Sequence, residues 1–126
     1  MRFPDIEALV RQRLLGGVYA GGASVYIKVP ATRPKTFLRV WRTGGAAVNR
    51  VLDEPLITVE SWSSESDKIA VDNANAAREL LLNASGVMPL VRGVEEVTGL
   101  YYDPDPVSGV TRYTFTVRLR VRAARS

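Results

Sequence analysis

The sequence contains no cysteine and no histidine. The absence of cysteine excludes disulfides, thiolate metal sites and cysteine nucleophiles, and it suits a reducing cytoplasmic environment. The absence of histidine removes the most frequent general base and the most frequent ligand of transition metals. The chain also lacks a secretory signal and any apolar stretch near the roughly 20 residues that a membrane span requires. We therefore expect a soluble, unprocessed protein with no cofactor, no bound metal and no membrane partner.

The remaining composition is that of one globular domain over residues 1–126, with 46% hydrophobic residues. A chain of this size buries about two thirds of its unfolded surface, which is enough for a single core. Its formal net charge of +4 comes mostly from arginine, with 14 arginines against 3 lysines. Such a balance allows contact with nucleic acid or with an acidic protein surface, but requires neither. A GC-rich coding genome explains the arginine excess equally well.

Apolar residues at three- and four-residue spacing predict two helices. The first begins near Pro4, buries one stripe that includes Ile6, Val10 and Leu14, and ends at Gly16–Gly17. The second begins at Lys68, after a serine-rich turn able to cap it, and its stripe is largely alanine. Small side chains let this helix approach a sheet closely. The alanine-rich stripe consists of Ala70, Ala74, Ala77, Leu81 and Ala84.

Alternation of apolar and polar residues predicts five strands, and proline-rich or glycine-rich turns separate them. Residues 45–53 have no sustained period and are predicted to be a long connection, and residues 102–109 a long hairpin loop. Helices separated by runs of strands predict an α+β domain: a mainly antiparallel sheet of about four to five strands, packed on one face by two helices, in the order α-β-β-β-α-β-β. The predicted strands are Ser24–Val29, Thr36–Arg42, Leu56–Trp62, Val91–Thr98 with a bulge near Glu95–Glu96, and Thr111–Arg122.

No group of residues predicts catalysis. Glu95 and Glu96 are neighbours on a strand and therefore point to opposite faces of the sheet. The carboxylates Asp53, Glu54, Asp103 and Asp105 lie beside prolines, where a solvated turn is the better interpretation than an acid/base pair or a calcium loop. The glycine pairs lack the spacing and the lysine of a phosphate-binding loop. We therefore expect neither a metal site nor enzyme activity.

The second face of the predicted sheet is more informative, because two helices cannot cover both faces. This face combines aromatic side chains with arginines. Both residue types are enriched in buried protein interfaces, and a monomer seldom leaves such a patch exposed. A subunit interface is our favoured interpretation. A solvated face with cross-strand pairs and a surface that stacks the bases of nucleic acid are the alternatives. The candidate interface residues are Tyr26, Phe37, Arg39, Trp41, Glu60, Trp62, Arg118 and Arg120.

Four segments together resemble one family. They are FPDIEALVRQRL at residues 3–14, KTFLRVWRTGG at 35–45, PLITVESWSSESDKIAVDNANAARELLL at 55–82 and TRYTFTVRLRVR at 111–122. In this order and at this length, they resemble the tail terminator proteins of long-tailed, siphovirus-type bacteriophages, particularly those infecting actinobacteria. The resemblance covers nearly the whole chain. The loop LYYDPDPVSG before the last strand is longer than the acidic, proline-containing turn that the family more often has there.

The resemblance implies a structural role in the virion, at the head-proximal end of the tail, after assembly in the host cytoplasm. Such proteins form a ring, typically of six subunits, that ends polymerisation of the tail tube and receives the connector of the filled head. Their partners are further copies of themselves, the tail tube protein, the head-tail connector or neck proteins, and genomic DNA that passes through the lumen without sequence-specific binding. The candidate tube or neck contacts are Gly44, Gly45, Val48, Asn49, Arg50, Asp103 and Asp105.

DNA must slide through such a ring, and unpaired arginines in the lumen would hold its phosphates. We therefore expect Arg118 and Arg120 to pair with carboxylates rather than to face the channel. The alternatives to a terminator are a neck or head-completion protein of the same particle and a small nucleic-acid-binding α+β domain.

Overall fold

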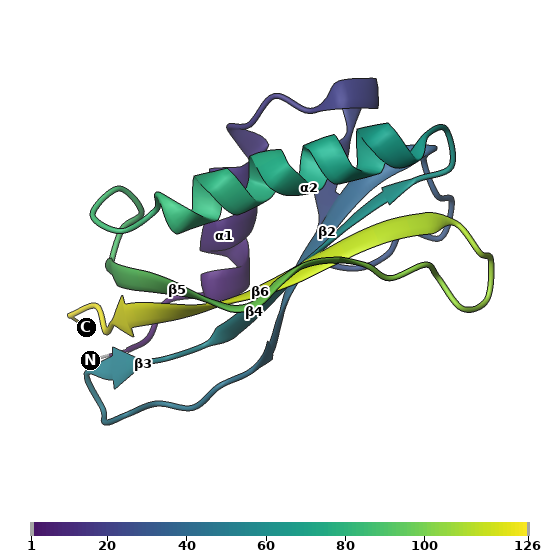
Figure 1. Cartoon of the computed structure of the whole chain (residues 1–126). Helices are drawn as coiled ribbons and strands as arrows, with labels where there is room; N and C mark the ends of the chain where they lie inside the picture. The colour runs from purple at the N-terminus through teal and green to yellow at the C-terminus, as the bar shows by residue number, and fades with distance from the viewer. Residues whose placement is uncertain (1, 126) are drawn as a thin grey trace.

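The computed structural model describes residues 2–125, which form one α+β fold (Figure 1). Both helices lie on the same side of a six-stranded sheet, and the two ends of the chain lie close together. The predicted fold class is confirmed. In chain order the elements are α1 (Ile6–Leu15), the 3-10 turn η1 (Ala20–Gly22), β1 (Ser24–Tyr26), β2 (Thr36–Gly44), β3 (Leu52–Asp53), β4 (Leu56–Ser63), α2 (Asp67–Leu82), β5 (Val91–Tyr102) and β6 (Thr111–Arg122).

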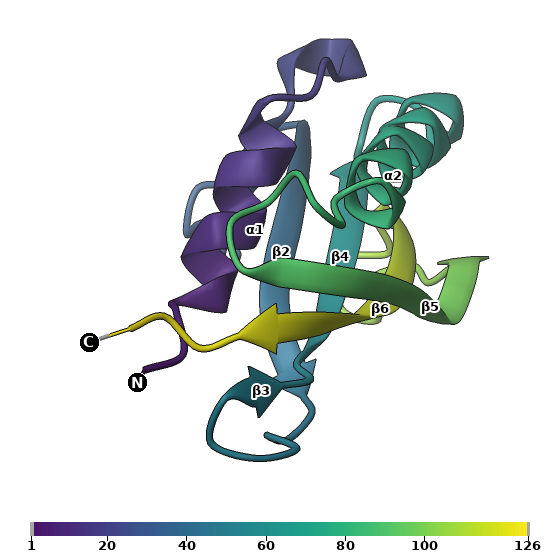
Figure 2. The same ribbon diagram turned by 90° about the vertical axis from the view of Figure 1, so that its left-hand side faces the viewer.

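The sheet is antiparallel except at one edge. β1 pairs with β2 in parallel, whereas the pairs β2 with β4, β4 with β6 and β6 with β5 are antiparallel. β3 also pairs with β6, in the register that β4 uses, since Leu52 lies opposite Arg122 and Leu56 opposite Arg118. Figure 2 shows that β5 and the end of β6 run across the direction of β2 and β4, as the accumulated twist of neighbouring strands produces.

Several strand boundaries differ from the sequence prediction, and two of the differences have a clear physical cause. The strand expected at Ser24–Val29 ends at Tyr26, because the Ile27 carbonyl accepts a hydrogen bond from the Arg39 guanidinium (3.2 Å) instead of continuing the ladder. The connection expected before Leu56 contains β3, which is separated from β4 by Glu54 and Pro55. Because proline has no N–H to donate, the ladder is interrupted there rather than ended. The Pro55 carbonyl still accepts from the Leu119 amide at 3.0 Å.

β5 is longer than predicted and is bulged, with register shifts against β6 that include one between Glu96 and Thr98. The bulge expected near Glu95–Glu96 is therefore present. The two carboxylates point to opposite faces, as predicted. Glu95 pairs with Arg118 on the second face of the sheet, and Glu96 binds Arg78 of α2 with an oxygen-to-nitrogen distance of 2.9 Å.

Local capping fixes where both helices begin. α1 starts at Ile6, two residues later than Pro4 at the first helical position would place it, because Asp5 is the N-cap and its carboxylate accepts from the Ala8 amide. α2 starts at Asp67, where the Ser66 hydroxyl accepts from the amides of Lys68 and Ile69. The hydroxyl cap predicted from the serine-rich turn is therefore confirmed.

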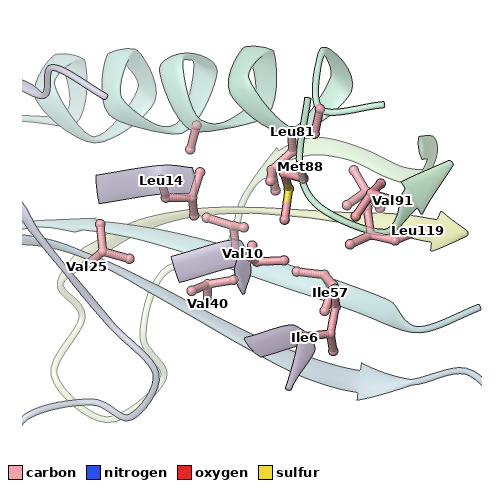
Figure 3. Close-up of a cluster of buried hydrophobic side chains, with 14 of the residues drawn as sticks. Ile6, Val10, Leu14, Val25, Val40, Ile57, Leu81, Met88, Val91 and Leu119 are labelled. Carbon is pink, nitrogen blue, oxygen red and sulfur yellow. The ribbon is translucent and has the colours of Figure 1, made fainter. Parts of the chain in front are cut away.

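The core lies between the helices and the first face of the sheet (Figure 3). Ile57 and Val59 of β4 are fully buried there, together with the alanine stripe of α2. Two polar side chains fasten the layers. The Ser61 hydroxyl donates to the Ala70 carbonyl at 2.7 Å, and the buried Asn73 amide bonds both the N–H and the carbonyl of Ala20. Both of these buried polar side chains are thus hydrogen-bonded, as a stable core requires.

Candidate assembly interface

The second face of the sheet, opposite the helices, carries most of the residues that the sequence nominated for an interface. Strand alternation brings them there: Phe37, Arg39 and Trp41 of β2 lie opposite Trp62, Glu60 and Thr58 of β4 respectively. The parallel pairing of β1 places Tyr26 beside Arg39. The tertiary structure therefore gathers the predicted residues on one face, as expected.

An aromatic stack forms one half of this face. The rings of Phe37 and Trp62 lie nearly parallel, 5.1 Å apart with an interplanar angle of 18°, and Tyr26 meets Phe37 edge-on at 6.0 Å. The guanidinium carbons of Arg33 and Arg112 each lie 5.0 Å from the centre of the Trp62 ring. The cation–π contact of Arg33 binds the loop between β1 and β2 to the sheet, whereas Arg112 reaches the same ring from β6.

Arg112 is the centre of a charged network beside that stack. Its guanidinium contacts a carboxylate oxygen of Glu60 at 3.2 Å and one of Asp103 at 3.1 Å, and its Nε donates to the Asp103 carbonyl. Glu60 also accepts a hydrogen bond from the Trp62 indole N–H at 3.2 Å. Arg39 approaches Glu60 from β2 at 3.7 Å. The network therefore connects β2, β4, β6 and the β5–β6 loop.

Asp105 holds the β5–β6 loop in a closed conformation. Its carboxylate accepts from both the amide and the hydroxyl of Ser108, and it lies 3.5 Å from the Arg33 guanidinium. The hydrogen bonds from Ser108 hold the pKa of the Asp105 carboxyl below its usual value. The loop is thus joined to the loop between β1 and β2 by Arg33, whose guanidinium also lies beside the Trp62 ring.

These contacts correct the premise that this face is uncovered. Phe37 and Trp62 are each 2% exposed and Glu60 is 5% exposed within the single chain. Asp105, expected in a solvated turn, is 8% exposed, and Asp53 is 5% exposed because Arg42 binds both its oxygens, at 3.0 and 3.2 Å. A carboxylate can be buried at a tolerable cost when an arginine pairs with it, as Arg42 does with Asp53 and Arg33 with Asp105. Asp105 and the half-buried Asp103, both nominated for tube or neck contacts, hold their own loop through these contacts.

Burial also affects the ionisation of Glu60. Removal from water raises the pKa of its carboxyl above the usual value, because the charged form loses hydration. The Arg112 guanidinium and the indole N–H of Trp62 act in the opposite direction by stabilising the carboxylate.

Five of the nominated interface residues still reach the surface. Tyr26, Arg39, Trp41 and Arg118 are half-buried, and Arg120 is exposed. The Arg39 guanidinium lies 3.8 Å from the centre of the Trp41 ring, so these two side chains present one combined aromatic and cationic surface. That surface is what remains available for a partner.

The other half of the second face is charged and open. A hollow of about 420 Å³ is bounded there by Glu54, Gly93, Glu95, Arg118 and Arg120, among others. Arg118 forms an ion pair with Glu95, and Arg120 with Glu54 at 3.3 Å. The expected pairing of both arginines with carboxylates is therefore confirmed within the chain.

The loop nominated for tube or neck contacts, residues 44–50, projects from the end of the sheet (Figure 2). Arg42 fixes its base by donating to the carbonyls of Gly44 and Gly45. Asn49 shapes its far side, since the carboxamide oxygen accepts from the amides of Val51 and Leu52. Val48 is 55% exposed and Arg50 is also exposed. The loop is therefore well ordered but open to a partner.

Sequence inspection missed Arg112 and Arg33 as organisers of the second face. A signal for Arg112 was present, because Tyr102 lies opposite Tyr113 and the next positions outward are Asp103 and Arg112. Opposite charges at the mouth of a hairpin are expected to pair. No comparable signal marks Arg33, whose contacts depend on how a remote loop folds.

Two further features bear on the kind of protein. Within residues 2–125, no group of three or more carboxylates is placed to hold a metal ion. In the same part of the chain, no helix has the length and apolar character needed to cross a membrane.

The fold is thus an α+β domain whose sheet carries two helices on one face and folded loops on the other. Among solved structures it is similar to a chain of a structure described as "Virion of native gene transfer agent (GTA) particle", with a TM-score of 0.72 and 16% sequence identity. The likeness covers 94% of this chain and 95% of that chain, so the two share the fold over their whole length. No family model and no curated protein matches the sequence.

Proposed function

We propose that this chain is a structural protein of a phage-like virion and acts there as the tail terminator. In this role it forms a ring of six copies on the head-proximal end of the tail tube. The ring ends tube polymerisation and offers the surface to which the connector or neck proteins dock. Genomic DNA passes through its lumen without sequence-specific binding, and the chain has no catalytic task.

The observation that carries this proposal is the whole-chain likeness, at a TM-score of 0.72, to a chain of a gene transfer agent virion. The resemblance of four sequence segments to tail terminators points independently to the same kind of particle. The architecture agrees with a scaffold role, because its buried arginine–carboxylate network rigidifies a surface instead of forming an open catalytic cleft.

A closed ring requires head-to-tail contacts between two different patches of each subunit. We assign one of these two subunit patches to Tyr26, Arg39 and Trp41, with Arg118 and Arg120 at its border. Contacts with the tube or neck are assigned separately, to the loop from Gly44 to Arg50. The buried Phe37, Glu60 and Trp62 support the first patch from beneath. Asp103 and Asp105 support it by holding the β5–β6 loop.

The test is assembly of the full chain, measured by light scattering and negative-stain electron microscopy, alone and with tail tubes of the same particle. Six copies of a 13.8 kDa chain give a ring of about 83 kDa. Rings, or tubes capped at one end and limited in length, are the expected result. Tubes that grow without limit and carry no cap when the folded chain is in excess would contradict the proposal.

A matched pair of variants tests the assigned patch. Trp41→Ala removes the indole side chain that the Arg39 guanidinium contacts. This variant is expected to assemble into the six-copy ring at least tenfold less, because central aromatic residues dominate interface energetics. Val18→Ala changes a side chain that is 93% exposed on the connection after α1, and it is expected to assemble normally. Equal assembly by both variants would show that the subunit interface does not lie at the Trp41 patch.

The neck or head-completion role remains the second candidate, since the likeness to a virion chain supports it equally. A neck protein would bind the connector but leave free tube ends uncapped. The third candidate, a sheet that stacks nucleic-acid bases, loses support because Phe37 and Trp62 are each only 2% exposed.

A further inference from the structure

Five exposed arginines gather at one end of the molecule, where the two termini, β3 and the start of β5 meet. Figure 2 looks directly onto this end. We call this surface the arginine end, and its members are Arg2, Arg50, Arg92, Arg122 and Arg125.

Backbone contacts bring these residues together from four parts of the chain. Arg2 and Ala124 exchange two hydrogen bonds, of 3.0 and 2.8 Å, so that Arg2 lies beside the residue preceding Arg125. The Arg122 amide donates to the Leu90 carbonyl at 2.8 Å, close to Arg92, and the Ala123 amide donates to the Val51 carbonyl, next to Arg50. The grouping is therefore a product of the tertiary fold.

The arginines of this end differ from the other arginines of the molecule, because they have no carboxylate partner in the described part of the chain. Of the 14 arginines, seven form ion pairs with carboxylates. Arg11 and Arg13 donate to backbone carbonyls. Within residues 2–125, the other five guanidinium groups have neither an ion pair nor a hydrogen bond, and all five are at this end.

The nearest carboxylates in sequence and register already have partners. Asp53 binds Arg42 with both oxygens, and Glu54 pairs with Arg120. Asp5 caps α1 by accepting from the Ala8 amide. The positive charge of the arginine end is therefore available to an external anion.

The chemistry of this surface favours phosphate over a protein partner. Protein interfaces have an apolar centre that is depleted of charge and enriched in aromatic residues. The aromatic residue beside the arginine end, Phe3, lines a hollow with Arg2 and Arg125 but is half-buried. Exposed apolar neighbours such as Val48 and Val51 are small. Guanidinium groups bind phosphates with paired hydrogen bonds, and several of them spread over a surface match the repeating charge of a nucleic-acid backbone.

We propose that the arginine end binds the phosphate backbone of duplex DNA without reading its sequence. This inference goes beyond the proposed function, which assigns no surface to DNA. The arginine end shares only Arg50 with the loop proposed for tube or neck contacts, and the inference applies to the folded chain whether or not a ring forms. Binding is electrostatic and sensitive to salt.

The test is fluorescence anisotropy of a labelled duplex titrated with the full chain over a series of salt concentrations. Five phosphate contacts predict a slope of about −4.5 for log K against log salt, and hence a loss of about 500-fold in affinity between 50 and 200 mM salt. Absence of binding at 50 mM salt would overturn the proposal.

Two double variants with the same net charge, +2 in place of +4, separate this surface from general attraction. Arg122→Gln/Arg125→Gln is expected to reduce the slope to about −2.7 and the salt-induced loss to about 40-fold. Lys28→Gln/Lys35→Gln removes exposed cations from the loop at the opposite end of β2 and is expected to keep the wild-type slope. Circular dichroism of both variants establishes that they are folded.

Equal weakening by the two variants would overturn the proposal, because it would assign binding to net charge alone. Competition provides a further arm, in which unlabelled duplex is compared with poly-L-glutamate at equal charge concentration. Stronger displacement by unlabelled duplex is expected. Stronger displacement by poly-L-glutamate would assign the surface to an acidic protein partner and overturn the proposal.

Discussion

Arg112 of β6 and Glu60 of β4 form an ion pair of 3.2 Å on the face of the sheet that no helix covers. Both side chains are largely buried, with side-chain exposures of 14% and 7%. The pair is shielded by the β5–β6 loop, whose Asp103 shares the same guanidinium. A face that the sequence predicted to be open is therefore closed at one half by the chain itself.

Removing the cation of this pair is expected to destabilise the fold strongly. Arg112→Met leaves Glu60 buried with only the more distant Arg39, and breaking a buried pair from one side typically costs about 3 to 5 kcal/mol. Glu60→Gln leaves Arg112 its contacts with Asp103, so a smaller loss of about 1 to 2 kcal/mol is expected. Urea unfolding at pH 7 measures both. A larger loss for Glu60→Gln than for Arg112→Met would contradict this order.

The raised pKa of Glu60 predicts a particular dependence of stability on pH. A carboxyl whose pKa is higher in the folded state than in the unfolded state binds protons preferentially when folded, so its contribution is greatest below the unfolded value, near 4.5, and is lost as pH rises through the folded pKa. The free energy of unfolding of the wild type, relative to Glu60→Gln, should therefore fall over that window. A rise with pH would mean that Arg112 outweighs the loss of hydration.

Gly45 is expected to tolerate no side chain. It has a φ of +84°, and a Cβ there would lie 2.2 Å from the Glu54 carbonyl oxygen, so the backbone would have to move. Gly45→Ala should cost at least about 3 kcal/mol, as backbone strain and overpacking add together. Gly86→Ala is the matched control, because Gly86 has a φ of +78° but open space around it, and about 1 kcal/mol is expected. Similar losses in urea unfolding would show that the clash is relieved without cost.

The alanine stripe of α2 sets how closely the helix approaches the sheet. Ala77 is fully buried in the core, so Ala77→Leu should overpack it and cost about 1 to 3 kcal/mol. Asn75→Leu introduces the same side chain at an exposed position of α2, where a change within about 0.5 kcal/mol is expected. Thermal unfolding of the two variants measures the difference. A neutral Ala77→Leu would indicate spare volume between helix and sheet.

Local sequence determined the elements whose signals are local. The two-residue alternation of apolar side chains predicted the bounds of β6, Thr111–Arg122, because the alternate residues from Phe115 to Val121 are buried in the core. The serine-rich turn determined the start of α2, since Ser66 caps it with its own hydroxyl. The separation of Glu95 from Glu96 onto opposite faces followed from strand geometry alone.

Only the tertiary structure decided how the second face is used. Burial of Trp62 depends on Arg33 and Arg112, which lie 29 and 50 residues away in the chain. Arg33 reaches the Trp62 ring from the loop between β1 and β2, and Arg112 reaches it from β6. The arginine end likewise forms because Arg2 meets Ala124 and Ala123 meets Val51. Periodicity specifies which face of a strand a residue occupies, but long-range contacts decide whether that face is covered by the chain, paired with a carboxylate or left open to a partner.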